Sequence, residues 1–161
     1  MTIHSFNDAE ALRIAIEMET RGEAFYTKAA RISKNPETVK IFQQLAADET
    51  VHRAEFEKLV AKANLSHVDY DQEASAYLNA IAADVVFSEG LMALRTTGFE
   101  TPEGALIEAI RSEKDSVMFY TELAERASDK EAADVFAEII FQEKAHLRTL
   151  QLRLAKLTSE G

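Results

Sequence analysis

The stretch DETVH at residues 48–52 is central to the fold, because it returns as QEKAH at residues 142–146. Both stretches contain a Glu-x-x-His unit within sequence that has the apolar spacing of a helix. Residues three apart on a helix lie on one face, about one turn from each other. A carboxylate and an imidazole in this arrangement can hold one ion between them.

The two stretches belong to an internal repeat with an offset of 94 residues (146 − 52 = 94). Sliding residues 10–60 onto 104–154 without a gap matches 13 of 51 positions. Random matching at typical residue frequencies would give only roughly 3 or 4. Besides the two Glu-x-x-His units, the matches include Glu19 with Glu113 and Tyr26 with Tyr120. The chain therefore contains two copies of one helical hairpin.

Apolar residues at helical spacing predict an all-α protein with four long helices. Only 2 Pro and 5 Gly occur in 161 residues, so few positions interrupt a helix. Asn35-Pro36 separates the first two helices, and Pro36 suits the first position of the second. Thr101-Pro102 begins the third helix with a capping residue followed by proline, and Ser128-Asp129 caps the fourth.

These breaks divide the chain into two hairpins, residues 7–63 and 102–158, joined by a crossover over residues 64–101. We expect a single domain, residues 1–161, with a shorter helix over residues 72–87 inside the crossover. A crossover of this size can travel the roughly 40 Å length of a bundle. The second and third long helices are therefore expected to be parallel.

The composition argues against several classes of protein. A net charge of −10 disfavours nucleic acid or an anionic membrane as a partner. The absence of cysteine excludes disulfides, thiol nucleophiles and iron–sulfur clusters. The first ten residues have no basic start and no apolar run, and no stretch of about 18 apolar residues occurs. We therefore expect a soluble, cytoplasmic protein.

The hairpin geometry brings the repeated acidic residues to one level. Glu19 and Glu49 lie about 15 residues before and after a turn centred near residues 34–35, so both are roughly 22 Å from it. Glu113 and Glu143 satisfy the same relation about the second turn. Two hairpins packed face to face would therefore place four Glu and two His in one layer of the core.

Such a layer is best explained as a metal site, because buried ionised carboxylates without partners are strongly unfavourable. Two divalent ions balance four carboxylates, and the same ligand set occurs in di-iron and di-manganese carboxylate bundles. A lone Glu-x-x-His unit would arise by chance in a chain this rich in Glu, whereas two units in register with two further Glu are specific. The predicted metal ligands are Glu19, Glu49, His52, Glu113, Glu143 and His146.

Four motifs resemble those of the ferritin-like superfamily, most closely its rubrerythrin-like branch: Glu19-x-x-Gly22-x-x-Phe25-Tyr26, Glu49-x-x-His52, Glu113-x-x-Ser116-x-x-Phe119-Tyr120 and Glu143-x-x-His146. The resemblance covers the whole chain. It implies a ferritin-like four-helix bundle with a long crossover between helices 2 and 3. It also implies two iron ions as cofactor, although Mn or Zn can occupy the same kind of site.

The resemblance further implies a role for each ligand. Glu49 and Glu143 would bridge the two metals, whereas Glu19 with His52, and Glu113 with His146, would complete one position each. The chain departs from full rubrerythrins in two ways. It lacks their cysteine-rich, rubredoxin-like domain, and Ser116 stands where they carry an extra carboxylate, which puts their redox-linked ligand exchange in doubt.

By the same resemblance, we expect a non-haem di-iron oxidoreductase, acting as a peroxidase or a ferroxidase. It would reduce hydrogen peroxide or dioxygen with electrons from an external donor, such as a rubredoxin-like protein, or it would oxidise Fe(II). The alternative is a non-catalytic protein that binds or stores iron, or a bundle whose site is only structural. We also expect a homodimer.

Tyr26 and Tyr120 lie two helical turns beyond the outer Glu ligands and should face the site. Each either bonds to a carboxylate or relays electrons there, or it only packs in the core with a satisfied hydroxyl. Each ligand histidine should donate its other ring N–H to a carboxylate or carbonyl across the bundle. Asp48 is not expected to be such an acceptor, because it precedes Glu49 and should face elsewhere.

Overall fold

The computed structural model describes residues 6–62, 68–82 and 101–160, and this part of the chain forms five α-helices and no strand. The all-α prediction is confirmed. The helices are α1 (Asp8–Ile32), α2 (Pro36–Ala61), α3 (Gln72–Ala82), α5 (Pro102–Arg126) and α6 (Lys130–Glu160). The short helix expected over residues 72–87 begins as predicted, and its continuation beyond residue 82 lies outside the described residues.

Side-chain caps set where the long helices begin. The Asn7 side chain accepts from the backbone N–H of Glu10 at the start of α1. Asn35 accepts from two backbone N–H groups at the start of α2, where Pro36 stands at the first position. Thr101 accepts from Gly104 N at 3.0 Å, and Asp129 accepts from Ala132 N at 3.1 Å. These bonds satisfy backbone donors that have no partner within the first turn.

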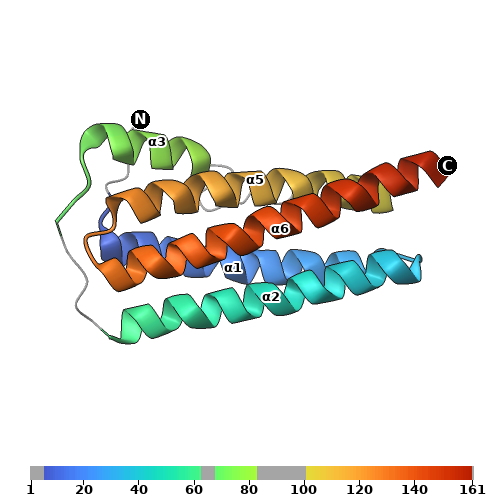
Figure 1. Ribbon diagram of the computed structural model, residues 1–161, viewed down its shortest axis with the longest axis horizontal. Helices are drawn as coiled ribbons and strands as arrows, with labels where there is room; N and C mark the ends of the chain where they lie inside the picture. Colours follow the sequence, from blue (N-terminus) through green and yellow to red (C-terminus); the bar gives the residue numbers. More distant parts are fainter. Residues whose placement is uncertain (1–5, 63–67, 83–100, 161) are drawn as a thin grey trace.

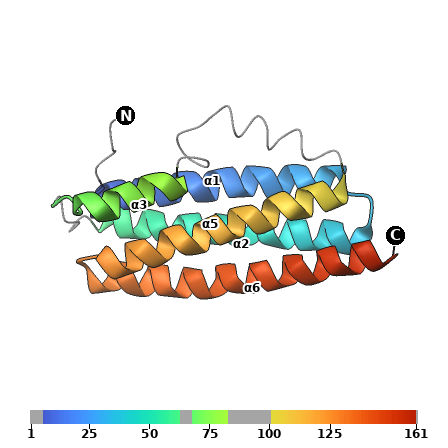
Figure 2. The ribbon, with the colours of Figure 1, turned by 90° about the horizontal axis from the view of Figure 1, so that it is seen from above.

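The four long helices form two antiparallel hairpins, α1 with α2 and α5 with α6. Figure 1 shows the hairpins as two layers in which α2 and α5 run in the same direction. Across the layers, α1 packs on α5 and α2 packs on α6. Figure 2 shows α3 at one end of the bundle, where it contacts α5. The parallel arrangement of the second and third long helices is therefore as predicted.

Two hydrophobic clusters fill the bundle, one on each side of the Glu/His level. The cluster at the end near α3 includes Leu12, Met18, Phe56, Leu78, Phe119, Leu123 and Phe136. The other includes Phe25, Phe42, Leu45, Leu106, Ile110 and Leu150. The residue numbers on each long helix place the six predicted ligands between these clusters, so apolar side chains cover the polar level from both ends.

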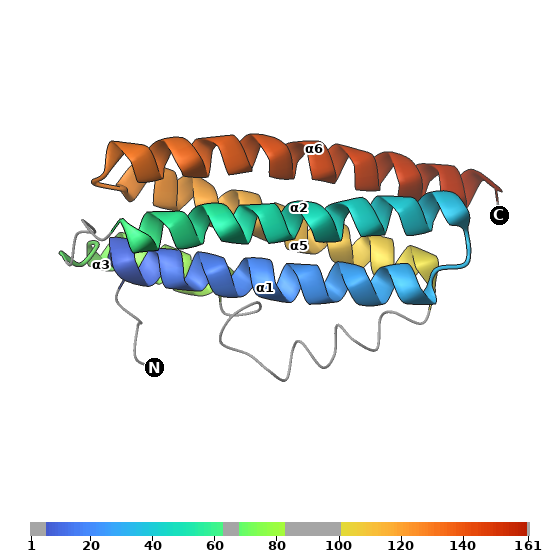
Figure 3. The same ribbon diagram turned by 90° about the horizontal axis from the view of Figure 1, so that it is seen from below.

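Asp8 ties three segments together at one end of the bundle. Its side chain is buried at the start of α1, accepting from Tyr70 Oη at 2.8 Å and from Ser128 Oγ at 2.5 Å. The segment before α3 and the turn between α5 and α6 are thus both held to the start of α1, which Figure 3 shows beside α2. Within residues 6–62, 68–82 and 101–160, no helix combines the length and apolarity that a membrane span requires.

Candidate metal centre

The structure brings all six predicted ligands together in the middle of the bundle. Each is at least nine-tenths buried, and one Glu comes from each of α1 and α5, whereas α2 and α6 each supply a Glu and a His. The imidazole rings of His52 and His146 are stacked, with centroids 5.8 Å apart. The layer that the repeat predicts is therefore present.

The ligand atoms divide into two groups that share members. One group is Glu19, Glu49, His52 and Glu143, and the other is Glu49, Glu113, Glu143 and His146. Within each group the ligand atoms all lie within 4.8 Å of one another. Because Glu49 and Glu143 belong to both groups, the arrangement suits two ions bridged by two carboxylates.

Several buried polar atoms of the cluster have no hydrogen bond of good geometry. In the described part of the chain these atoms are Glu19 Oε2, His52 Nδ1, Glu113 Oε2, Glu143 Oε1 and His146 Nδ1. His52 Nδ1 lies 2.8 Å from Glu143 Oε1, so a lone pair there would face a carboxylate oxygen. Buried polar atoms without partners are costly. A cation among these atoms would remove that cost, and the donor set therefore fits divalent metal.

Tyrosine hydroxyls hold the two outer carboxylates. Tyr26 Oη donates to Glu113 Oε1 at 2.5 Å, and Tyr120 Oη donates to Glu19 Oε1 at 2.7 Å. Each bond joins α1 to α5, and each leaves the second carboxylate oxygen free to face the site. The structure therefore gives both tyrosines a contact with the cluster, one of the two alternatives that the sequence leaves open.

The outer ring nitrogens of the histidines also have partners across the bundle. His52 Nε2 donates to Gln142 Oε1 at 2.7 Å, and His146 Nε2 lies 3.0 Å from Asp48 Oδ2. The expectation that each histidine bonds to a carboxylate or carbonyl is confirmed. The expectation about Asp48 is wrong, because this side chain lies on the α2 surface that faces α6.

Residues 10–152 match the family model of rubrerythrin. The chain belongs to the rubrerythrin family. Its structure is also similar to that of a Thermotoga maritima protein described as a ferritin-like diiron-carboxylate protein. That similarity has a TM-score of 0.70 and 27% identity, and it covers 94% of this chain and 97% of the other. A comparison with curated protein sequences found no match.

In this rubrerythrin-family chain, a glycine stands where α1 passes the shared carboxylate of Glu49. A Cβ added at Gly22 would lie 3.1 Å from Glu49 Oε2 and 3.2 Å from its Cδ. The repeat counterpart of Gly22 is Ser116. Glycine at position 22 therefore leaves the space that Glu49 occupies.

The metal-free cluster of this rubrerythrin-family protein favours positive charge. Burial, followed by the charge of Glu143, raises the pKa of Glu49 and of Glu113 well above the usual value. Burial alone would lower the pKa of a histidine, but contacts with the carboxylates raise the pKa of His52 to about 11 and that of His146 to about 10. Protons supply this charge in the absence of metal, and divalent cations can replace them.

Two surface grooves between α2 and α6 reach the histidines. His52 and Gln142 line one groove, and His146 and Asp48 line the other. The same offset of 94 residues relates the two grooves. Each histidine therefore forms part of the boundary between the buried cluster and the surface.

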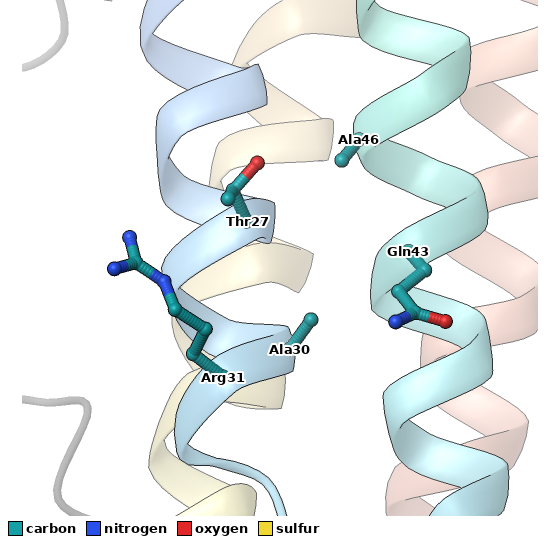
Figure 4. Close-up of a pocket in the computed structure, with 5 residues that line it drawn as sticks. All are labelled: Thr27, Ala30, Arg31, Gln43 and Ala46. Atoms are coloured by element: carbon teal, nitrogen blue, oxygen red, sulfur yellow. The ribbon is translucent and has the colours of Figure 1, made fainter.

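A further hollow lies between α1 and α2 (Figure 4), lined by Thr27, Ala30, Arg31, Gln43 and Ala46. The Arg31 guanidinium points away from α2 in this view. None of the five residues belongs to the Glu/His cluster, and the hollow is not part of the candidate centre.

Proposed function

We propose that this protein binds two iron ions in the cluster and acts as an oxidoreductase. Its substrates would be hydrogen peroxide or dioxygen, reduced with electrons from an external donor, or Fe(II), which it would oxidise. The observation that carries the proposal is the pair of four-residue groups sharing Glu49 and Glu143. Membership of the rubrerythrin family and likeness to a ferritin-like diiron-carboxylate protein support iron over Mn or Zn.

The roles of the side chains follow from their contacts. Each outer Glu with its histidine would complete one metal position, and the two shared carboxylates would bridge the positions. Bound iron would supply or accept the electrons of the reaction. Burial raises the pKa of Tyr26 and Tyr120 far above the usual value, so both phenols remain O–H donors to the outer carboxylates. The hydrophobic clusters keep bulk water from the polar level.

Peroxide reduction by this chain would need electrons from outside. The sequence has no cysteine and hence no thiolate site that could relay them. A rubredoxin-like protein acting in trans is the donor we propose, whereas oxidation of Fe(II) needs none. A homodimer and a cytoplasmic location stay predictions.

Metal analysis and activity can be measured on the same samples. Protein purified without air, then titrated anaerobically with Fe(II), should bind two ions per chain. Peroxide should then be consumed faster with a reduced donor than through oxidation of free Fe(II) alone. Glu113→Ala should lower both binding and turnover, while Glu125→Ala, an exposed Glu on the same helix, should change neither. If the protein binds two ions but neither consumes peroxide with a reduced donor nor oxidises Fe(II), it is a non-catalytic iron-binding or storage protein.

A further inference from the structure

The partners of the two histidines differ in charge. Asp48 presents a carboxylate to His146, with Nε2 and Oδ2 3.0 Å apart. Gln142 presents a neutral amide oxygen to His52 at 2.7 Å. Because both partners are acceptors toward Nε2, each ring directs Nδ1 toward the cluster. The two imidazoles thus have the same orientation and different electrostatic support.

The internal repeat allows the two histidine partners to be compared at equivalent positions. Gln142 is the counterpart of Asp48 (142 − 48 = 94), and Glu138 is the counterpart of Gln44. Gln44 Nε2 donates to Asp48 Oδ1 at 2.9 Å, and Gln142 Nε2 donates to Glu138 Oε1 at 3.1 Å. From each histidine outward, one acidic and one amide side chain are therefore linked by hydrogen bonds. The order differs: the acid, Asp48, is next to His146, whereas the amide, Gln142, is next to His52 and the acid follows it.

The reversal places a carboxylate on the outer nitrogen, Nε2, of His146 but not on that of His52. Hydrogen bonds to an ionised acceptor are roughly twice as strong as those between neutral groups. A carboxylate on the outer nitrogen of a metal-bound histidine also increases the donor strength of the inner nitrogen. His146 should therefore be the better ligand. Glu138 is exposed and accepts from Gln142, the side chain that lies between it and His52, so solvent screens its effect.

The tyrosine support of the two outer carboxylates is similar. Both outer carboxylates accept from a tyrosine, and both tyrosines stack on a phenylalanine, Tyr26 on Phe42 and Tyr120 on Phe136, with centroids 6.0 Å apart in each case. Gly22 lies against Glu49, a carboxylate that belongs to both groups.

We propose that the two metal positions are unequal, the position at Glu113 and His146 being the tighter. Asp48 and Gln142 are the positioning residues that set the difference. The inference rests on the proposed function, because it assumes that the cluster binds metal. Loss of such an outer partner typically lowers metal affinity by about 10- to 100-fold, and the two positions should differ by a factor in this range.

Variants that each disable one position allow the two to be compared. Metal-free, full-length Glu19→Ala retains the His146 position, and Glu113→Ala retains the His52 position. Anaerobic titration with Co(II), followed by visible absorption at one fixed pH, gives the dissociation constant of the first ion in each. We expect Glu19→Ala to bind that ion about 10- to 100-fold more tightly than Glu113→Ala.

Adding Asp48→Asn to each variant supplies an internal control. The substitution should weaken binding by about tenfold or more in the Glu19→Ala background and should have little effect in the Glu113→Ala background. Adding Gln142→Glu together with Glu138→Gln to Glu113→Ala should tighten the remaining position, because the pair of changes reproduces next to His52 the acid and amide order that Asp48 and Gln44 have next to His146. Circular dichroism melting establishes that each variant is folded.

The outcomes separate this inference from the proposed function. Equal constants in the two single-position variants would overturn the inequality while leaving a metal centre in place. An Asp48→Asn effect of the same size in both backgrounds would overturn the role of Asp48. Failure of the wild-type protein to take up Co(II) or Fe(II) would refute the metal centre itself.

Discussion

Replacing Gly22 with alanine should raise the stability of the metal-free bundle and lower its affinity for metal. Alanine is favoured over glycine in a helix interior by about 1 kcal/mol. The added Cβ would lie 3.1 Å from Glu49 Oε2, and ordinary contact begins near 3.4 Å, so the carboxylate must move by about 0.3 Å (3.4 − 3.1). Metal–ligand distances tolerate only about 0.2 Å. The substitution should therefore stabilise the metal-free helix and misplace a ligand.

The expected magnitudes have opposite signs. The metal-free Gly22→Ala protein should melt about 2–4 °C above the metal-free wild type, because 1 kcal/mol corresponds to roughly that shift in a chain of this size. Its Fe(II) affinity should fall by about tenfold, which removes about 1.4 kcal/mol of the stabilisation that metal provides. Anaerobic melting curves with and without Fe(II), together with a binding titration, measure both effects.

Gly104→Ala, in the first turn of α5 and distant from the cluster, is the matched control. It should not alter the rise in melting temperature that Fe(II) causes. If Gly22→Ala raises the metal-free melting temperature and binds Fe(II) with wild-type affinity, the proposed reason for glycine at this position is wrong.

Four further predictions follow from contacts and charges of the centre and its support. The metal-free protein should lose stability as pH rises from about 6.5 to about 10, because His52 and His146, with pKa values raised to about 11 and about 10, hold protons when folded that they release on unfolding, and the raised pKa values of Glu49 and Glu113 act in the same direction. The stabilisation by Fe(II) should correspondingly shrink as pH falls, which paired melting curves at two pH values would show; coincident curves with excess iron at neutral pH would refute metal binding. Tyr120→Phe should lower the free energy of unfolding by about 1–3 kcal/mol, since it leaves a buried carboxylate oxygen without its donor, and denaturant titration would reveal a smaller effect if the bond is unimportant. Asp8→Ala should cost a similar amount through the two hydroxyl donors it leaves unpaired, with no change in Fe(II) stoichiometry. His146→Ala should reduce occupancy of one metal more than the other, and metal analysis that finds full occupancy of both would exclude it as a ligand.

The ligand set could be predicted from the sequence because two independent regularities agree. Helical spacing places each His one turn from its Glu, and the fixed offset of the repeat aligns Glu19 with Glu113. Residues at equal distances from a turn then lie at the same level on the two antiparallel helices. None of these steps requires knowledge of side-chain conformation. The direction in which each histidine's outer nitrogen points does require it, so the identities of its partners, Gln142 and Asp48, do not follow from these regularities.

The position of Asp48 on α2 explains why its bond to His146 was not predicted and which spacing indicates it. The prediction considered Asp48 relative to its neighbour Glu49, which points in another direction on the helix. Asp48 is instead one turn before His52, on the same face of α2, just as Gln142 is one turn before His146 on α6. Where two such helices cross in antiparallel fashion, the residue one turn back on one meets the histidine of the other. The repeat contained this information, but only the packing of α2 on α6 shows that the helices cross there.

The bonds that support the centre all run from one hairpin to the other. Tyr26 reaches Glu113, Tyr120 reaches Glu19, and each histidine bonds to the opposite hairpin. A shorter gene encoding one hairpin could build the same centre by pairing two copies of its product, but both halves would then be identical. With both halves in one chain, each position of the repeat can change separately, so that one half carries Asp48 and the other Gln142.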